Sequence, residues 1–227
     1  MSNFTTGEQV AAAIEEVFAR LDACLAHARQ ELERRPLRAD AWSKLEHLEH
    51  VSLANHFLLL TIGKGCRKAC RRAAFGDPPA GESDLELLSP MAVPGAFQWI
   101  PPSHMLPTGN RQPEEIRSEL SGQRDRCREL LAGMAHGEGR LCTIYMSVHG
   151  AGKLDMYQWL FFLAQHARWH LAFLALREAN DESEGGMKFL SRTRQATLAP
   201  LCMTLTKNLV FKRQSLYFNE NNNLLTF

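Results

Sequence analysis

Two histidines with helical spacing, His166 and His170, are the residues whose chemistry is most readily defined from the sequence. Residues four positions apart in an α-helix lie on one face, one turn apart. Two imidazoles placed in this way can chelate one transition metal without bending the helix. The alternative is a pair of core histidines that are each hydrogen-bonded to a neighbour, since nine histidines in 227 residues can produce this spacing by chance.

The face that carries this pair is apolar. Trp159, Leu163, His166, His170 and Phe173 form one stripe, so the imidazoles are expected to point into the protein. An unpaired polar ring in the interior costs about 1–3 kcal/mol, and a bound metal ion removes that cost. The inward placement therefore favours a metal site over the alternative.

A third ligand is expected from a facing helix, and the segment from Ala41 to about Arg72 offers three histidines. His47 and His50 share one face, whereas His56 lies about 100° away from it. Helical geometry alone does not distinguish His47 from His50.

Three neutral imidazoles would leave a divalent metal with open coordination positions. Zinc or nickel suits such ligands best, with iron or manganese as further candidates.

An ion held in this way could lower the pKa of a bound water or activate a thiolate. The sequence places no carboxylate clearly as a general base, so the catalytic residues are not identified. Glu46, one turn before His50, could orient an imidazole or relay a proton, or it could be an ordinary surface carboxylate. Glu49 and His47 are interpreted as flanking residues.

Four long amphipathic segments are expected to position these residues. The first begins at a capping box formed by Thr5 and Glu8 and runs to Pro36, and the second begins after Asp40 and runs from Ala41 to about Arg72. The third has Pro113 at its first position, and Gly133 and Gly137 mark its end. The fourth is capped by Asp155 and Gln158 and runs to about Ala179. No convincing strand pairs accompany them. The pattern predicts an all-α fold, a helical bundle.

The connections predict how the helices are arranged. The short link between the first two segments favours antiparallel neighbours, whereas the link of about 40 residues between the second and third allows these two to be parallel. That long link, Phe75 to Arg111, contains seven of the ten prolines and is predicted to be a loop. It is expected to be packed down by four apolar anchors: Phe97, Trp99, Ile100 and Met105.

Composition excludes several classes of protein. Hydrophobic residues make up 45% and charged residues 22%, which argues against wholesale disorder, and the formal net charge is only +1. A basic cluster (Lys64, Arg67, Lys68, Arg71 and Arg72) ends the second segment. It could bind an anion or RNA, but no aromatic residues interleave the charges, so a solvated helix end is the preferred interpretation and no nucleic-acid partner is expected.

The remaining features indicate where the protein resides. The six cysteines include no C-x-x-C pair and are interpreted as reduced thiols, and the first residues do not resemble a signal peptide. The most apolar stretch, residues 156–176, contains ionisable side chains that would be costly in lipid. We therefore expect a cytoplasmic protein with no membrane partner.

The segment Trp42-Ser43-Lys44-Leu45-Glu46-His47-Leu48-Glu49-His50 resembles the second-helix signature of the DinB-like (damage-inducible) metal-binding superfamily. That signature has a Trp-Ser start, an acid four residues after the tryptophan and a histidine eight residues after it. The stretch from Gly152 to Leu171 is similar to the fourth helix of the same family. The resemblance covers about residues 8–178, so a bundle domain is predicted over residues 8–180 and an extension of uncertain structure over residues 181–227.

The resemblance implies a four-helix bundle with up-down-down-up topology and a metal held by His50, His166 and His170. Relatives include thiol-dependent S-transferases and a thiol-dependent maleylpyruvate isomerase. It therefore implies a metal-dependent enzyme, a hydrolase or a thiol-dependent transferase, that acts on a small molecule and uses a low-molecular-weight thiol. The alternative is a non-catalytic metal-binding or stress-related interaction protein, expected to form a homodimer. Trp169 and Phe173 depart from the family pattern, which often has a basic residue and a glutamine at these positions.

Overall fold

A computed structural model of the chain describes residues 5–36, 41–96 and 100–194, except for the side chains of His149 and of residues 180–194. The chain divides into two units, Met1–Glu184 and Gly185–Phe227. All of the side chains that the structure describes belong to the first unit. Most of the predicted extension, residues 195–227, lies outside the described residues.

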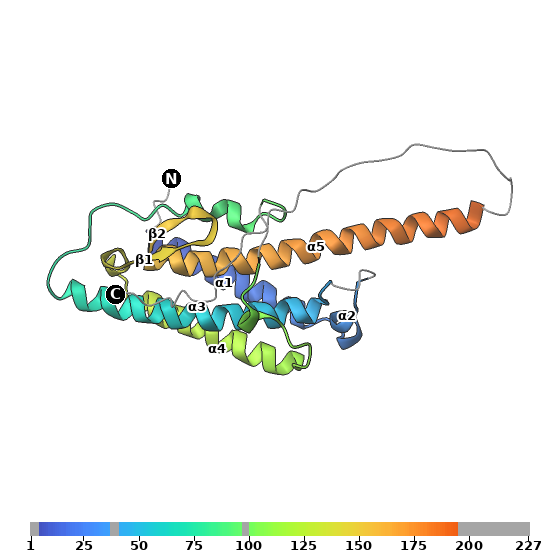
Figure 1. The fold of residues 1–227 in the computed structure, drawn as a ribbon, viewed down its shortest axis with the longest axis horizontal. Helices are drawn as coiled ribbons and strands as arrows, with labels where there is room; N and C mark the ends of the chain where they lie inside the picture. Colours follow the sequence, from blue (N-terminus) through green and yellow to red (C-terminus); the bar gives the residue numbers. More distant parts are fainter. Residues whose placement is uncertain (1–4, 37–40, 97–99, 195–227) are drawn as a thin grey trace. The chain divides into compact units, whose positions relative to one another are not determined.

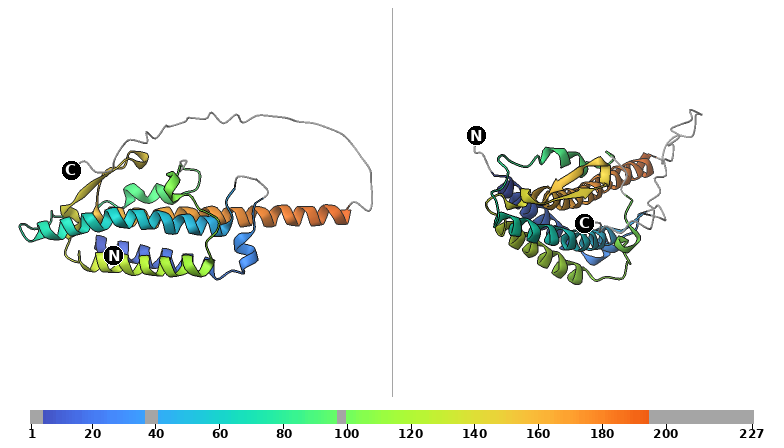
Figure 2. Two further views of the ribbon diagram at one scale, coloured as in Figure 1. Left: turned by 60° about the horizontal axis from the view of Figure 1, so that its bottom comes forward. Right: turned by 60° about the vertical axis from the view of Figure 1, so that its left-hand side comes forward.

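Helices dominate the described structure (Figure 1). The α-helices are α1 (Thr6–Leu25), α2 (Arg29–Glu33), α3 (Lys44–Ala73), α4 (Pro113–Ala132) and α5 (Met156–Arg194); short 3₁₀ helices are η1 (Glu86–Ala92), η2 (Ser103–Met105), η3 (Glu138–Leu141) and η4 (Val148–Gly150); the strands are β1 (Thr143–Met146) and β2 (Gly152–Asp155). The mostly helical architecture confirms the predicted fold class in its main feature. The two further views place α1, α3, α4 and the first part of α5 side by side (Figure 2).

The predicted starts of three helices are confirmed. Thr5 and Glu8 form the capping box of α1, and Pro113 is the first residue of α4. Asp155 Oδ1 accepts from the backbone N–H of Gln158 at 2.9 Å, while the Gln158 side chain accepts from the backbone N–H of Asp155 at 3.0 Å. Each pair satisfies N–H groups that the first turn of a helix leaves without partners, which is why these signals are readable in the sequence.

Three helix boundaries were predicted wrongly. The first helix does not run to Pro36, because the chain bends after Leu25 and resumes as α2, which buries Leu32 completely. The cap of α3 is Ser43, which forms a capping box with Glu46; residue 40 lies outside the described residues. The last helix continues beyond Ala179 to Arg194. Strong local capping at Ser43 fixed the start of α3 three residues later than predicted.

A small hairpin lies where no strand pair was predicted. β1 and β2 are antiparallel, with Thr143 opposite Asp155 and Met146 opposite Gly152. Gly150 and Gly152 have positive φ angles of 69° and 75°, which allow the tight connection. Strands of four residues are too short to show a clear alternation in the sequence, so this element was missed.

The core joins the four long helices. The apolar residues that recur at helical spacing in the sequence are mostly buried: Val10, Ile14, Val17, Phe18, Leu21 and Leu25 in α1, and Ile116, Leu120, Cys127 and Leu130 in α4. Two members of the predicted stripes are not, since Ala28 is exposed beyond the end of α1 and Leu131 is only half-buried. The predicted anchor Ile100 is instead 64% exposed, and Phe97 and Trp99 lie outside the described residues. Leu88 and Met91 of η1, with Leu85 directly before it, are buried and anchor the long connection.

Two further sequence expectations concern the cysteines and the absence of membrane-crossing helices. The five cysteines in the described part of the chain are free thiols, and Cys202 lies outside it. Among the described helices, none combines the length and the apolar character that a membrane crossing requires.

Candidate metal centre

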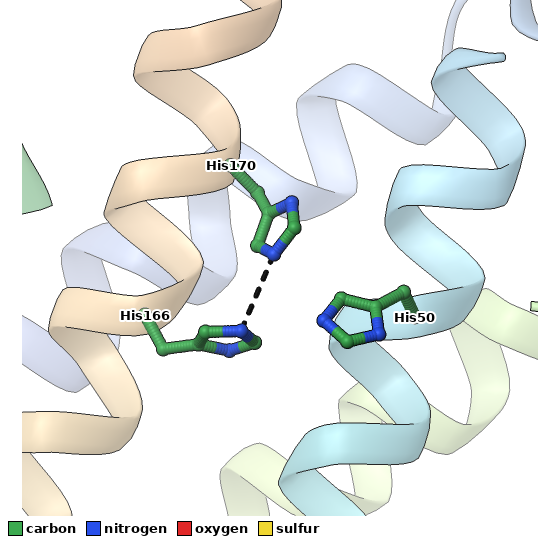
Figure 3. Close-up of side chains that lie close together, drawn as sticks. All are labelled: His50, His166 and His170. Atoms are coloured by element: carbon green, nitrogen blue, oxygen red, sulfur yellow. Dashed lines mark hydrogen bonds between the residues drawn. The ribbon is translucent and has the colours of Figure 1, made fainter. Parts of the chain in front are cut away.

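Three histidine rings from two helices converge in the interior of the first unit (Figure 3). His50 comes from α3, and His166 and His170 come from successive turns of α5. Each histidine offers one ring nitrogen as a ligand atom, and these three nitrogens lie within 4.8 Å of one another. The Nε2 atoms of His166 and His170 are 3.2 Å apart. Exposure of the three residues is between 3% and 5%. The structure thus brings together His166, His170 and the histidine that the family resemblance implies as the third ligand, His50.

The dimensions of this cluster suit one ion. Metal–nitrogen bonds of about 2.1 Å allow two ligating nitrogens to be at most about 4.2 Å apart. The His166–His170 pair satisfies this limit, and the nitrogen of His50 lies within 4.8 Å of both. The cluster consists of imidazoles alone: among the described residues, the group that could hold an ion includes no carboxylate.

A backbone carbonyl fixes the orientation of His50. Its Nδ1 lies 2.7 Å from the carbonyl oxygen of Met105 in η2. A carbonyl oxygen can only accept a hydrogen bond, so the proton of the neutral His50 ring is on Nδ1. The Nε2 lone pair is then free to ligate a metal. A partner of this kind also holds the ring in the orientation that ligation requires.

Glu49 positions the segment that carries this carbonyl. The Glu49 side chain, which is only 1% exposed, accepts from the backbone N–H and the hydroxyl of Thr108 at 2.8 and 2.7 Å and from the backbone N–H of Gly109 at 3.0 Å. Gly109 has a φ of 72°, a conformation that favours glycine. The interpretation of Glu49 as a flanking residue was therefore incomplete, because it anchors the chain beside Met105.

Glu46 has neither of the roles considered for it at the metal site. One carboxylate oxygen accepts from the Ser43 backbone N–H at 2.7 Å, and the other is 2.8 Å from Arg35 Nη2. Both contacts are at the N-terminus of α3, where a negative charge is stabilised by the helix dipole. The carboxylate thus caps a helix.

His47 lies beside the cluster. Its Nδ1 is 3.0 Å from Nδ1 of His170, and the residue is buried. The sequence left His47 and His50 as equal candidates on geometric grounds. The structure separates them, because His50 belongs to the three converging rings and His47 contacts His170 from the opposite side of that ring.

Burial keeps these rings neutral. Burial removes water from the rings, and this desolvation is the main reason why the pKa of His166 is lowered to about 3. Desolvation also lowers the pKa of His50. Burial lowers the pKa of His170 well below 6.5, and burial, together with the charge of Arg177, lowers that of His47 to about 3. An imidazole must be neutral to ligate a metal, so at neutral pH the rings are in the required state.

Aromatic rings surround the cluster. The Trp42 ring is 5.0 Å from His50 and 5.3 Å from His47, measured between centroids. Trp169 stacks on Phe173, with 5° between the ring planes, and lies 4.8 Å from His170. The two residues that depart from the family pattern thus form an apolar cover. Such a shell restricts access of water and lowers the local dielectric.

This arrangement defines the class of protein: a helical bundle with a three-histidine centre that could hold a divalent metal. The comparisons give the family. The family model described as DinB superfamily matches residues 8–174, and the chain belongs to that family. Searches of curated proteins and of solved structures found no match.

Proposed function

We propose that this protein is a metal-dependent enzyme that acts on a small molecule, as a hydrolase or a thiol-dependent transferase. A divalent metal, zinc or nickel in preference to iron or manganese, would be held by His50, His166 and His170. The observation that carries the proposal is the donor set of three converging imidazoles with no carboxylate among them. Structural zinc sites are closed by four protein ligands, whereas three ligands leave a position open for water or substrate.

The chain's own groups prepare this chemistry. When bound, the metal supplies positive charge that lowers the pKa of a bound water or thiol. The carbonyl of Met105 holds the proton of His50 on Nδ1, so that Nε2 faces the centre. Trp169 and Phe173 limit water around His170. We propose a low-molecular-weight thiol as the co-substrate of the transferase reaction.

The proposal includes the topology of the bundle. We infer an up-down-down-up order of α1, α3, α4 and α5. Support comes from the long connection between α3 and α4 and from Figure 1, where the colour sequence runs in the same sense along these two neighbouring helices. The contact between His47 and His170 makes α3 and α5 neighbours in this bundle.

A second candidate function is favoured by the burial of the site. The three rings are nearly inaccessible, and neither the groove between α3 and α4 nor the groove beside α1 is lined by any of them. A non-catalytic metal-binding or stress-related protein, acting as a homodimer, would need no access for substrate.

A turnover screen separates the two functions. The protein loaded with zinc or nickel is incubated with low-molecular-weight thiols and a panel of electrophiles, and separately with hydrolysable esters, while His170→Ala serves as the control for each substrate. The enzyme hypothesis predicts turnover by the wild-type protein that the variant lacks. Equal rates in wild type and variant, or no turnover of any substrate, would favour the non-catalytic function.

A further inference from the structure

A groove between α3 and α4 lies apart from the histidine centre. It has a volume of about 730 Å³ and is lined mainly by α3 residues between Ser52 and Arg67 and by α4 residues between Glu119 and Arg126, together with His104 and Arg111. None of the three clustered histidines lines it. The volume is in the range of sites that bind small molecules. We refer to it as the α3–α4 groove.

Two guanidinium groups meet in this groove. Nη1 of Arg67 and Nη2 of Arg126 lie 3.6 and 3.7 Å from the position that a Cβ atom on Gly63 would occupy, so both reach the same spot above α3. The other terminal nitrogen of Arg126, Nη1, donates a hydrogen bond to the Glu129 carboxylate at 2.7 Å. In the described structure, Arg67 and the neighbouring Lys64 make no ion pair. Two like charges that converge in this way are stabilised by an anion placed between them.

The acidic side chain of the groove is already engaged. Glu119 accepts two hydrogen bonds from Arg111, at 2.7 and 2.8 Å, and a third from the Ser52 hydroxyl at 2.7 Å. These bonds hold the pKa of Glu119 below its ordinary value and keep it ionised. Four basic side chains and this one carboxylate line the groove, although the whole chain carries a formal charge of only +1. The positive charge is thus concentrated here.

The rest of the groove is apolar. Leu53, Phe57, Leu59 and Leu60 contribute to its lining, and Leu60 is 52% exposed. The Phe57 ring packs edge-on against His104, with 4.4 Å between the ring centroids. An exposed leucine and a phenylalanine along α3 offer a surface that an apolar group would bury favourably.

We propose that the α3–α4 groove binds a small amphipathic anion. Its carboxylate or phosphate group lies between Arg67 and Arg126, near Lys64, and its apolar body lies along Leu60 and Phe57. The cations converge on one spot next to an apolar surface. Nucleic acid instead requires charges spaced along a track and aromatic rings for successive bases. The basic cluster at the end of α3 thus divides into residues that line the groove, Lys64 and Arg67, and residues that do not.

The test uses the fluorescent anionic amphiphile 1-anilinonaphthalene-8-sulfonate as the probe, with the full-length protein. We expect binding of one probe per chain, displacement by octanoate and by octyl phosphate, and no displacement by octanol. The relative potency of octanoate and octyl phosphate shows whether a carboxylate or a phosphate is preferred. The double variant Arg67→Gln/Arg126→Gln should weaken probe binding by about tenfold or more, because charge-assisted hydrogen bonds are lost.

Matched controls separate charge from position. Arg71→Gln removes the same charge from the same helix but outside the groove, and should leave probe affinity unchanged. Leu60→Gln should weaken binding, whereas Leu87→Gln, at a similarly exposed leucine in η1, should not. Circular dichroism verifies that each variant is folded. Equal affinity of the double variant and the wild type, equal displacement by octanol, or tighter binding of a short single-stranded RNA at the same arginines would overturn the proposal.

Discussion

The Nδ1 atoms of His47 and His170 lie 3.0 Å apart, which makes His47 the immediate neighbour of a candidate metal ligand. At this separation one nitrogen donates and the other accepts. If His170 ligates a metal through Nε2, its proton is on Nδ1 and is donated to His47. His47 then acts as a positioning residue, because it fixes the tautomer and the ring orientation of His170.

His47→Phe should therefore weaken metal binding without removing a ligand. The expected loss of affinity is about 10- to 100-fold, the range for partners of metal ligands. His47→Gln should retain more affinity, because its amide oxygen can accept from His170. Competition with a chromophoric chelator measures these affinities, and His56→Phe, an exposed residue of the same helix, is the control. Equal affinities of the phenylalanine variant and the wild type would exclude the positioning role.

Glu49→Ala should reduce both stability and metal affinity. The change leaves the donors of Thr108 and Gly109 without their acceptor and frees the segment that holds the carbonyl of Met105 against His50. We expect a loss of about 2–4 kcal/mol in the free energy of unfolding, measured with urea.

Glu46→Ala is the matched control for this experiment. It removes a carboxylate three residues earlier in α3, and with it the capping-box hydrogen bond to the Ser43 backbone N–H, which is worth about 0.5–1.5 kcal/mol, but the hydrogen bonds of Glu49 to Thr108 and Gly109 do not involve Glu46. Metal affinity should fall only in the Glu49 variant. A parallel loss of affinity in both variants would show that general destabilisation, rather than the Met105–His50 contact, is responsible.

His170→Ala should abolish metal binding. Elemental analysis of the purified wild type is expected to find about one divalent ion per chain, and an ion that binds only the folded state stabilises it by about 2.7 kcal/mol at a concentration of 100 Kd. Chelation should therefore lower the melting temperature of the wild type by several degrees and leave that of His170→Ala unchanged. His136→Ala, at an exposed histidine, should behave like the wild type. A metal content below about one tenth of an ion per chain in wild type would refute the site.

The candidate ligands could be predicted because they lie on regular helices. The spacing of His166 and His170 indicates a ligand pair, and a family signature selected His50 where helical geometry left His47 open. The partners of these ligands could not be predicted. Met105 and the Thr108–Gly109 pair lie in an irregular segment with no periodicity, where contacts depend on tertiary packing.

The errors in the fold concern short elements and the ends of helices, about which the sequence pattern carries little information. The bend after Leu25 and the hairpin of β1 and β2 involve few residues, so hydrophobic periodicity carries little information about them. Ser43 and Glu46 have the spacing of a capping box, but Asp40 offers a competing cap three residues earlier, so the sequence alone leaves the start of α3 ambiguous. The starts of α1, α4 and α5 were predictable because their caps are local and unambiguous.

The metal-free protein should lose stability as the pH falls from about 7.5 to about 5.5. Burial lowers the pKa values of His47 and His166 to about 3 and those of His50 and His170 below 6.5, whereas in the unfolded chain these residues take up protons as the pH falls through about 6.5. Below that pH the unfolded state binds more protons than the folded state, so the free energy of unfolding declines with decreasing pH.

Each of the four histidines contributes up to about 1.4 kcal/mol per pH unit once the pH is below about 6.5 and its folded-state ring is still neutral. The measurement is urea unfolding at about pH 7.5 and 5.5 in the presence of a chelator, a range that lies above the ordinary pKa of carboxyl groups. His47→Phe removes one of the four groups and should reduce the difference between the two pH values by about one histidine's share. If the free energy of unfolding were the same at both pH values, or larger at the lower one, the four rings would not be buried and neutral as the structure places them.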